Sequence, residues 1–279
     1  MTSARNGRLW VLIAVLAAIA LTAGVIIGTH LGGRPNTPSS APTASLAAEF
    51  AQLETQLHAV AGIAVSGVGP GHEPVSVGQW QSGPAWSTIK VPLIIAALRE
   101  EVPPQITDAM TAAITESDNA AAESIWDSLG TPSEAARKVE AVLRQTGDPT
   151  VVQAQRVRPE FSASGQTDWP LTAQVRFTSA AVCDTENDPV FDLMGRVEQD
   201  QRWGIGTVVD SRFKGGWGPS PTGGYLVRQI GVLTTPAGMV AVAMAALPFS
   251  GKFEDGTAAL TTMTDWLSQR LGAVPAGHC

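Results

Sequence analysis

Residues 84–100 read PAWSTIKVPLIIAALRE, and the rest of the chain is best interpreted from this stretch. Ser87 and Lys90 lie three positions apart at the start of a predicted helix, so their side chains face the same way. The run VPLIIAAL that follows is apolar on nearly every side of that helix, which indicates burial. Pro92 falls in the first turns, where loss of an amide donor costs least. The sequence therefore predicts a buried helix over residues 87–100 with a hydroxyl and an amine at its start.

A serine and a lysine in this arrangement form an activated nucleophile if burial or neighbouring cations keep the amine neutral. The amides at a helix N-terminus also favour a developing oxyanion. The simpler interpretation is a serine cap followed by a surface lysine. Ser211 and Lys214 have the same spacing, but they lie in a strand pattern, where such positions face opposite sides. Ser87 is therefore the better candidate nucleophile.

A second polar cluster, Ser117-Asp118-Asn119, interrupts the Ala-rich helical run AAITESDNAAAESIWDSLG. Helix interiors normally avoid these residue types, because their side chains compete for backbone hydrogen bonds. The cluster is either a kink and cap between two short helices or a site that supplies a hydroxyl for proton relay and an amide for a substrate carbonyl. A third group, Lys214-Gly215-Gly216, ends a predicted strand and offers a cation beside an edge without side chains. Its simpler interpretation is the start of an ordinary hairpin.

The order of predicted elements indicates an α+β fold. A helix from about residue 46 precedes two strands at 61–68 and 73–80, and three strands at 207–217, 225–235 and 239–247 precede a closing helix at 254–271. Between them lie predicted helices at 87–100, 106–129, 132–144, 171–182 and 189–201, with a loop at 151–167. We expect the terminal segments to build one antiparallel sheet.

The three motifs, in this order, resemble the S-x-x-K, S-D-N and K-T-G signature of the class A β-lactamase and penicillin-binding protein superfamily. The resemblance covers roughly residues 46–271 and implies a β-lactamase/transpeptidase-like fold. It implies Ser87 as the acyl-accepting nucleophile and Lys90 as its base. Ser117 would shuttle a proton, Asn119 would hold the substrate amide, and Lys214 would attract the substrate carboxylate. The oxyanion hole would be the amides of Ser87 and of Trp217, which follows Gly216, and Arg228 in the next strand would help to bind the carboxylate.

The chain also departs from the family pattern. Only 30 positions separate Ser87 from Ser117, about half the usual distance, so we expect a shortened helical subdomain and a more open site. Gly215 replaces a Thr or Ser that would touch the carboxylate. Arg158-Pro159-Glu160 resembles the start of the loop whose glutamate activates the deacylating water, but Ala163 and Ser164 replace the expected Leu and Asn. An ordinary surface glutamate is therefore the more common interpretation of Glu160.

The N-terminal region is divided into three segments before the predicted domain at 45–279. Residues 1–8 carry two arginines, and the uncharged run from Leu9 to Ile27 is long enough to cross a membrane as a helix, so residues 9–29 are a predicted anchor with the domain outside the cytoplasm. A cleaved signal peptide is the alternative. Residues 30–44 are rich in Pro, Ser and Thr and are typical of an extended linker.

Composition excludes several other functions. The net charge of −7, with one Tyr and no basic cluster, disfavours nucleic-acid binding. Four His and two Cys show no metal-ligand spacing, so we expect no metal and no cofactor. The cysteines, Cys183 and Cys279, are even in number and belong to a predicted oxidising compartment, which favours a disulfide.

The sequence as a whole predicts a serine hydrolase that forms an acyl-enzyme with β-lactams or with D-Ala-D-Ala-like peptides of the cell wall. The absence of the full glutamate-loop pattern favours a penicillin-binding peptidase over an efficient lactamase. The alternative is a non-catalytic module of the same fold that binds cell-wall peptide or an envelope protein. The sequence does not identify the natural substrate or the oligomeric state.

Overall fold

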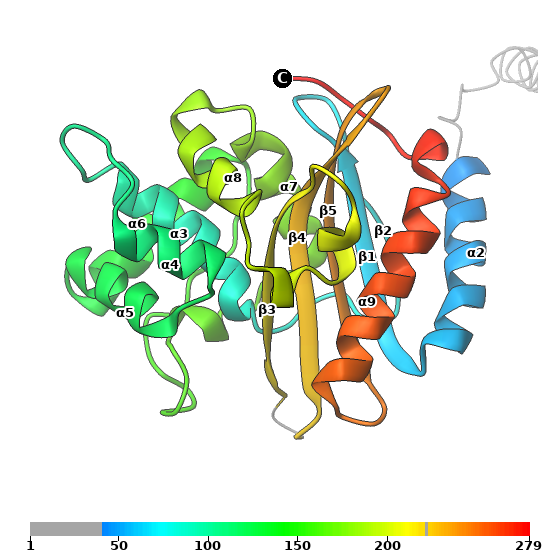
Figure 1. The fold of residues 1–279 in the computed structure, drawn as a ribbon, viewed down its shortest axis with the longest axis horizontal. Coiled ribbons are helices and arrows are strands. Elements are labelled where there is room, and N and C mark those ends of the chain that lie inside the picture. Colours follow the sequence, from blue (N-terminus) through cyan, green and yellow to red (C-terminus); the bar gives the residue numbers. More distant parts are fainter. Residues whose placement is uncertain (1–40, 221–222) are drawn as a thin grey trace, which may run out of the picture. The chain divides into compact units, whose positions relative to one another are not determined.

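A five-stranded antiparallel sheet forms the centre of the fold in this computed structural model, which describes residues 41–220 and 223–279 (Figure 1). The strand order is β2-β1-β5-β4-β3, with bounds β1 Ala59–Gly67, β2 Val75–Gly78, β3 Arg212–Pro219, β4 Tyr225–Thr235 and β5 Gly238–Pro248. β1 pairs along its whole length with β5, from Ala59 opposite Pro248 to Gly67 opposite Val240. The predicted sheet built from both ends of the chain is therefore confirmed, and β3 is left at its edge.

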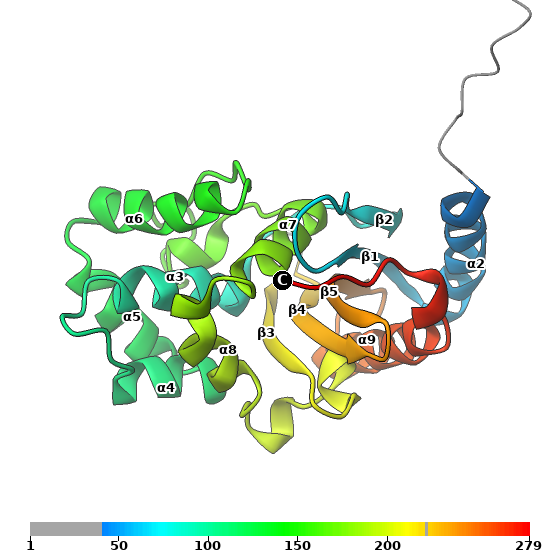
Figure 2. The same cartoon turned by 90° about the horizontal axis from the view of Figure 1, so that it is seen from above.

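Alternating side chains of the strands form two cores, one on each face of the sheet. Ile63, Val65 and Met244 point to the face covered by α2 (Ala41–Leu57) and α9 (Phe253–Ser268), where Phe50 of α2 packs on Trp266 of α9 with ring centroids 5.3 Å apart. The period of two along a strand places the intervening residues on the opposite face. That face is covered by α7 (Leu171–Ala181), beyond which the remaining helices gather (Figure 2).

The remaining α-helices make up the helical subdomain: α3 Lys90–Leu98, α4 Asp108–Thr115, α5 Asn119–Ser128, α6 Pro132–Gln145 and α8 Asp188–Met194. Short 3-10 turns connect several elements, at Trp86–Ile89, Ser164–Gln166, Thr185–Asn187, Gln199–Gln201, Gly204–Thr207 and Leu271–Ala273. Every residue of α3 is buried, as its apolar sequence predicts. The helix α6 begins with a capping box between Thr131 and Glu134, which fixes its start close to the predicted residue.

Three predicted elements differ from the structure. The single helix expected over residues 106–129 is two helices, because Ser117 adopts a positive φ of 61° and Asp118 caps α5 by accepting a hydrogen bond from the Ala121 amide at 2.8 Å. The strand expected from residue 207 begins at Arg212, after a 3-10 turn. The helix expected over residues 189–201 ends at Met194.

The C-terminal tail is fastened to the sheet and to the end of α7. Gly277 pairs with Met239 at the start of β5, and Cys279 forms a disulfide with Cys183, with 5.1 Å between the two Cα atoms. The predicted disulfide is therefore confirmed.

The predicted membrane anchor at residues 9–29 and most of the linker at 30–44 lie outside the described residues. Within residues 41–220 and 223–279, no helix combines the length and the apolar character needed to cross a membrane.

Candidate active site

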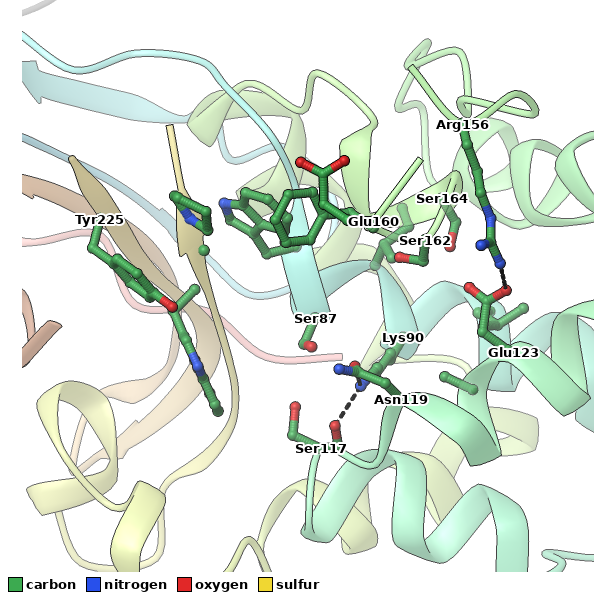
Figure 3. Close-up of a pocket in the computed structure, with 18 residues that line it drawn as sticks. Ser87, Lys90, Ser117, Asn119, Glu123, Arg156, Glu160, Ser162, Ser164 and Tyr225 are labelled. Atoms are coloured by element: carbon green, nitrogen blue, oxygen red, sulfur yellow. Dashed lines mark hydrogen bonds and ion pairs between the residues drawn. The ribbon is translucent and has the colours of Figure 1, made fainter. Parts of the chain in front are cut away.

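A cleft of about 380 Å³ opens where α3, α5 and the loop before α7 meet the end of β3 (Figure 3). Five of the predicted site residues line it, namely Ser87, Lys90, Ser117, Asn119 and Trp217, whereas Lys214 and Gly216 are absent from its lining. Figure 3 shows the first four with their polar groups turned toward one another. The other lining residues are Trp86, Ile89, Leu93, Ala122, Glu123, Arg156, Glu160, Phe161, Ser162, Ser164, Gly218, Pro219 and Tyr225.

Ser87 lies in a 3-10 turn that leads directly into α3. The preceding residue, Trp86, has a positive φ of 48°, which is uncommon for a bulky side chain. The segment before it is held to the loop that precedes α7, because the Ala85 amide donates to the carbonyl of Thr167 at 2.8 Å. This sharp turn brings Ser87 to the cleft, one turn ahead of Lys90.

The ammonium of Lys90 is buried and donates to three oxygens of the segment 117–119. Its Nζ lies 2.6 Å from the Ser117 carbonyl, 3.2 Å from the Asp118 carbonyl and 2.8 Å from the Asn119 Oδ1. These acceptors account for all three protons of the charged form, and within the described residues no hydrogen bond joins Lys90 to Ser87. Burial lowers the pKa of Lys90 to about 8, against smaller opposing effects of Asp118 and Glu123. Deprotonation near neutral pH therefore yields an amine with a free lone pair.

Lys214 extends this polar network from β3. Its side chain is fully buried, and its Nζ donates to the Ser117 Oγ at 2.9 Å and to the Gly215 carbonyl at 3.0 Å. Burial, with a smaller contribution from the charge of Lys90, holds the pKa of Lys214 well below its usual value. The hydroxyl of Ser117 thus connects the lysine of β3 to the segment that binds Lys90.

The glycines of β3 differ in what surrounds them. A Cβ on Gly216 would lie 2.9 Å from the Ser87 nitrogen and 3.0 Å from the Thr88 nitrogen, so only glycine lets β3 approach the Ser87 turn this closely. A Cβ on Gly215 would lie 3.1 Å from the ring of Trp203. The indole of Trp203 therefore stands against the position where the family pattern has a hydroxyl side chain.

Glu160 and Arg228 do not lie where the resemblance implies. The carboxylate of Glu160 points away from Ser87, is 57% exposed and pairs with Arg158 at 3.4 Å (Figure 3). The expectation that Arg228 binds a substrate carboxylate is wrong, because its side chain is fully buried and is absent from the cleft lining. Strand β4 directs it beneath the segment that precedes Ser87, where backbone carbonyls surround it.

The structure adds an ion pair that the sequence analysis missed. Glu123 of α5 and Arg156 of the following loop line the cleft opposite Tyr225 and pair at 2.6 Å (Figure 3). Glu123 follows Asn119 by one helical turn, so both side chains lie on the same face of α5. That spacing was the available signal, because any residue one turn after a cleft residue is itself a cleft candidate.

The fold is that of known β-lactamases. TLA-3 extended-spectrum β-lactamase aligns with a TM-score of 0.63 at 16% identity, over 81% of this chain and 99% of that one. An ancestral class A β-lactamase (GNCA) aligns at 0.62 and 19% identity, over 80% and 99%. The β-lactamase from Sphaerobacter thermophilus DSM 20745 aligns at 0.61 and 21% identity, over 85% and 99%.

No protein-family model and no curated protein sequence matches the chain. At these identities the structural likeness establishes the fold, and the chain has the α+β fold of the β-lactamase/transpeptidase-like superfamily. The resemblance inferred from the three motifs is thereby confirmed as a resemblance of fold.

Proposed function

We propose that the protein is a serine hydrolase that forms an acyl-enzyme through Ser87. The observation that carries the proposal is the convergence of three separate segments on one cleft. Ser87 and Lys90 come from the start of α3, Ser117 and Asn119 from the start of α5, and Lys214 from β3 reaches Ser117. Lys90 and Lys214 both contact Ser117, and both have lowered pKa values, which favours proton transfer near neutral pH.

In the proposed reaction, neutral Lys90 takes the proton of the Ser87 hydroxyl while its Oγ attacks the substrate carbonyl carbon. The amides of Ser87 and Trp217 bind the oxyanion, and Asn119 holds the neighbouring amide of the substrate. The carbon–nitrogen bond of the substrate then breaks, and Lys90 returns the proton to the leaving nitrogen through the Ser117 hydroxyl. The product of this step is an ester between the substrate acyl group and Ser87.

Release of the acyl group is proposed to be slow. Hydrolysis of the ester needs a placed base to activate water, and such a base typically contributes about 10²- to 10⁴-fold. Of the two carboxylates that line the cleft, Glu160 points away from Ser87 and Glu123 is paired with Arg156. This arrangement supports a penicillin-binding, peptidase-like role over rapid lactam hydrolysis.

The proposed substrates are β-lactams and D-Ala-D-Ala-like cell-wall peptides. Lys214 is fully buried and does not line the cleft, so its proposed role is exerted through its hydrogen bond to the Ser117 Oγ and not by direct contact with the substrate carboxylate. The proposed location is outside the cytoplasm, with residues 9–29 as a membrane anchor. The support for this location is the sequence of the uncharged run from Leu9 to Ile27 and the arginines before it. The disulfide between Cys183 and Cys279 agrees with an oxidising compartment.

Mass spectrometry of the soluble domain after exposure to several penicillins and cephalosporins tests the proposal. We expect a mass increase equal to the drug, persistence of the adduct for minutes or longer, and no adduct on Ser87→Ala. Lys90→Ala is expected to slow adduct formation strongly. Absence of any adduct on the wild type would refute the catalytic proposal. Rapid turnover that Glu160→Gln abolishes would instead show that the loop supplies a working base.

A non-catalytic module that binds cell-wall peptide or an envelope protein is the second candidate. The position of Trp203 against Gly215 favours it, because an indole lies where the family pattern has a hydroxyl for the substrate carboxylate. A saturable interaction with peptidoglycan fragments that survives Ser87→Ala, in a protein that forms no adduct, would support this candidate.

A further inference from the structure

A fully buried arginine lies behind the nucleophile turn without a carboxylate partner. Arg228 of β4 is 0% exposed, and among the described residues no ion pair joins it to an acid. Its guanidinium stacks over Trp80 at 4.9 Å and donates to neutral oxygens only. Burying a charge without an ion pair is costly, and the nearby charge of Asp168 opposes this cost only in part, so the hydrogen bonds of the guanidinium must offset the rest.

The backbone acceptors of Arg228 belong to two segments, the residues just before Ser87 and the end of the loop before α7. Its Nη1 donates to the carbonyls of Gly83 and Pro84, each at 2.8 Å, and these residues lie just before Ser87. Its Nη2 donates to the carbonyl of Trp169, at the end of the loop before α7, at 2.9 Å. Trp169 in turn donates its amide to Gly83 at 3.0 Å, so the guanidinium closes a junction between the two segments.

A second arm of the same network reaches the residue after Ser87. The Nη2 of Arg228 also donates to the Oε1 of Gln174 in α7. The Nε2 of Gln174 donates to the hydroxyl of Thr88 at 2.9 Å, and that hydroxyl donates to the carbonyl of Ala85 at 2.6 Å. Arg228 is therefore connected to the backbone before Ser87 directly and to the residue after it through one amide side chain.

The turn at Trp86 lies between these two sets of hydrogen bonds and has an unfavourable backbone conformation. Trp86 has a φ of 48°, and a bulky residue in this left-handed region is strained, so the conformation persists only where the surrounding structure holds it. The indole nitrogen of Trp86 is buried without a hydrogen-bond partner among the described residues, so the side chain contributes no polar anchor. The bonds to Gly83, Pro84 and Thr88 therefore hold the turn together with the hydrogen bond from the Ala85 amide to the Thr167 carbonyl.

We infer that Arg228 is a positioning residue that holds residues 83–88 in the conformation that presents the Ser87 hydroxyl and amide to the cleft. It contacts neither the substrate nor Ser87. The effect on reaction rate rests on the proposed function, whereas the effect on the backbone does not. Lysine cannot replace it, because a single ammonium cannot reach acceptors on three segments, whereas the planar fork of arginine does so with two nitrogens.

The test compares Arg228→Met and Arg228→Lys with Met263→Ala, a fully buried substitution in the core on the opposite face of the sheet. Acylation by a fluorescent penicillin is followed well below the melting temperature of each variant and is separated into an affinity and a first-order acylation rate. Hydrogen exchange of a peptide that contains residues 83–90 is measured on the same samples.

For Arg228→Met we expect the first-order rate to fall by about tenfold to 10²-fold with nearly unchanged affinity, as misplacement of a reacting group predicts. Exchange of the 83–90 peptide should rise at least tenfold, and Arg228→Lys should restore neither property fully. Met263→Ala should lower the melting temperature without either change. Should Arg228→Met fail to fold, Gln174→Met, which breaks only the arm to Thr88, is expected to reduce the rate several-fold and to raise exchange.

Unchanged exchange of residues 83–90 in a folded Arg228→Met protein, or in Gln174→Met if that variant is used, would overturn the inference. The same holds if Met263→Ala slows acylation and raises exchange of this peptide as much as the arginine variant does. If the wild type forms no adduct, the proposed function fails, but the exchange measurement still decides whether Arg228 holds the turn.

Discussion

The pH dependence of acylation depends directly on the environment of Lys90. The neutral amine is the proposed base, so the reaction is lost as falling pH protonates it. With a pKa of about 8, about one tenth of the molecules carry the neutral amine at pH 7. The second-order acylation rate should therefore rise about tenfold between pH 6 and pH 7 and level off above pH 8 to 9. A lysine in water would give a rate that still rises near pH 10.

Glu123→Gln provides a sharper version of this prediction. The carboxylate of Glu123 raises the pKa of Lys90, so its removal should move the inflection to lower pH and increase the rate at pH 7. Loss of the carboxylate also leaves Arg156 unpaired beside the cleft, and its positive charge acts in the same direction. Glu160→Gln is the matched control, because Glu160 is not among the groups that perturb Lys90.

The assay is stopped-flow acylation with a fluorescent penicillin between pH 5.5 and pH 10, at constant ionic strength, with the folded state checked at each pH. An inflection near pH 10 would refute the view that burial sets the basicity of Lys90. A shift to higher pH in Glu123→Gln would show that the coupling between Glu123 and Lys90 has been assigned the wrong sign.

Three further outcomes are expected. Gly216→Ala should reduce acylation by at least about 10²-fold, because its Cβ would meet backbone atoms of the Ser87 turn. Gly215→Ala would meet only side-chain atoms of Trp203 and Trp217 and should cost less, as stopped-flow rates would show. Replacing both Cys183 and Cys279 by Ser should lower the free energy of unfolding by about 4 kcal/mol, measured by urea denaturation, while leaving adduct formation intact, since neither residue lines the cleft. Deletion of residues 1–28 should release the protein from membranes on fractionation, and a native soluble form that begins after residue 27 would show that the segment is a cleaved signal instead.

Much of the fold was predictable because the hydrophobic pattern of each segment and the turn or cap residues at its ends indicate the same element. The runs YLVRQIGVLTT and MVAVAMAAL, separated by the turn PAG, gave bounds for β4 and β5 within a residue of the structure. The limits of α6 followed from its start at Pro132 after a threonine cap. In each case the local signal and the tertiary burial favour the same structure.

The errors arise where tertiary contacts override local pattern. The helix expected over residues 106–129 is broken at Ser117, as the interpretation of a kink and cap between two short helices indicated, but the local pattern did not indicate that the Ser117 carbonyl and hydroxyl accept from two buried lysines. For Arg228, sequence order identified the neighbouring strand but not the face of the sheet, and a lone charge in an apolar strand gave no indication of its carbonyl partners. Glu160 is not such an error, because the interpretation as a surface glutamate agrees with its exposed side chain and its ion pair with Arg158.

The pairing of β1 with β5 also bears on when the domain can fold. Ala59 meets Pro248 in the sheet, so the central strand pair joins the two ends of the domain. In a chain that emerges from a ribosome or a translocation channel N-terminus first, β1 can pair early with β2, but its other edge must stay unpaired until β5 has followed. The chain loses conformational entropy in closing this long loop before the strand pair can stabilise the fold. We therefore expect slow, late folding with no stable N-terminal fragment. A protein that passes through a membrane unfolded would gain from this delay, since the fold is completed only after nearly all of the chain has crossed.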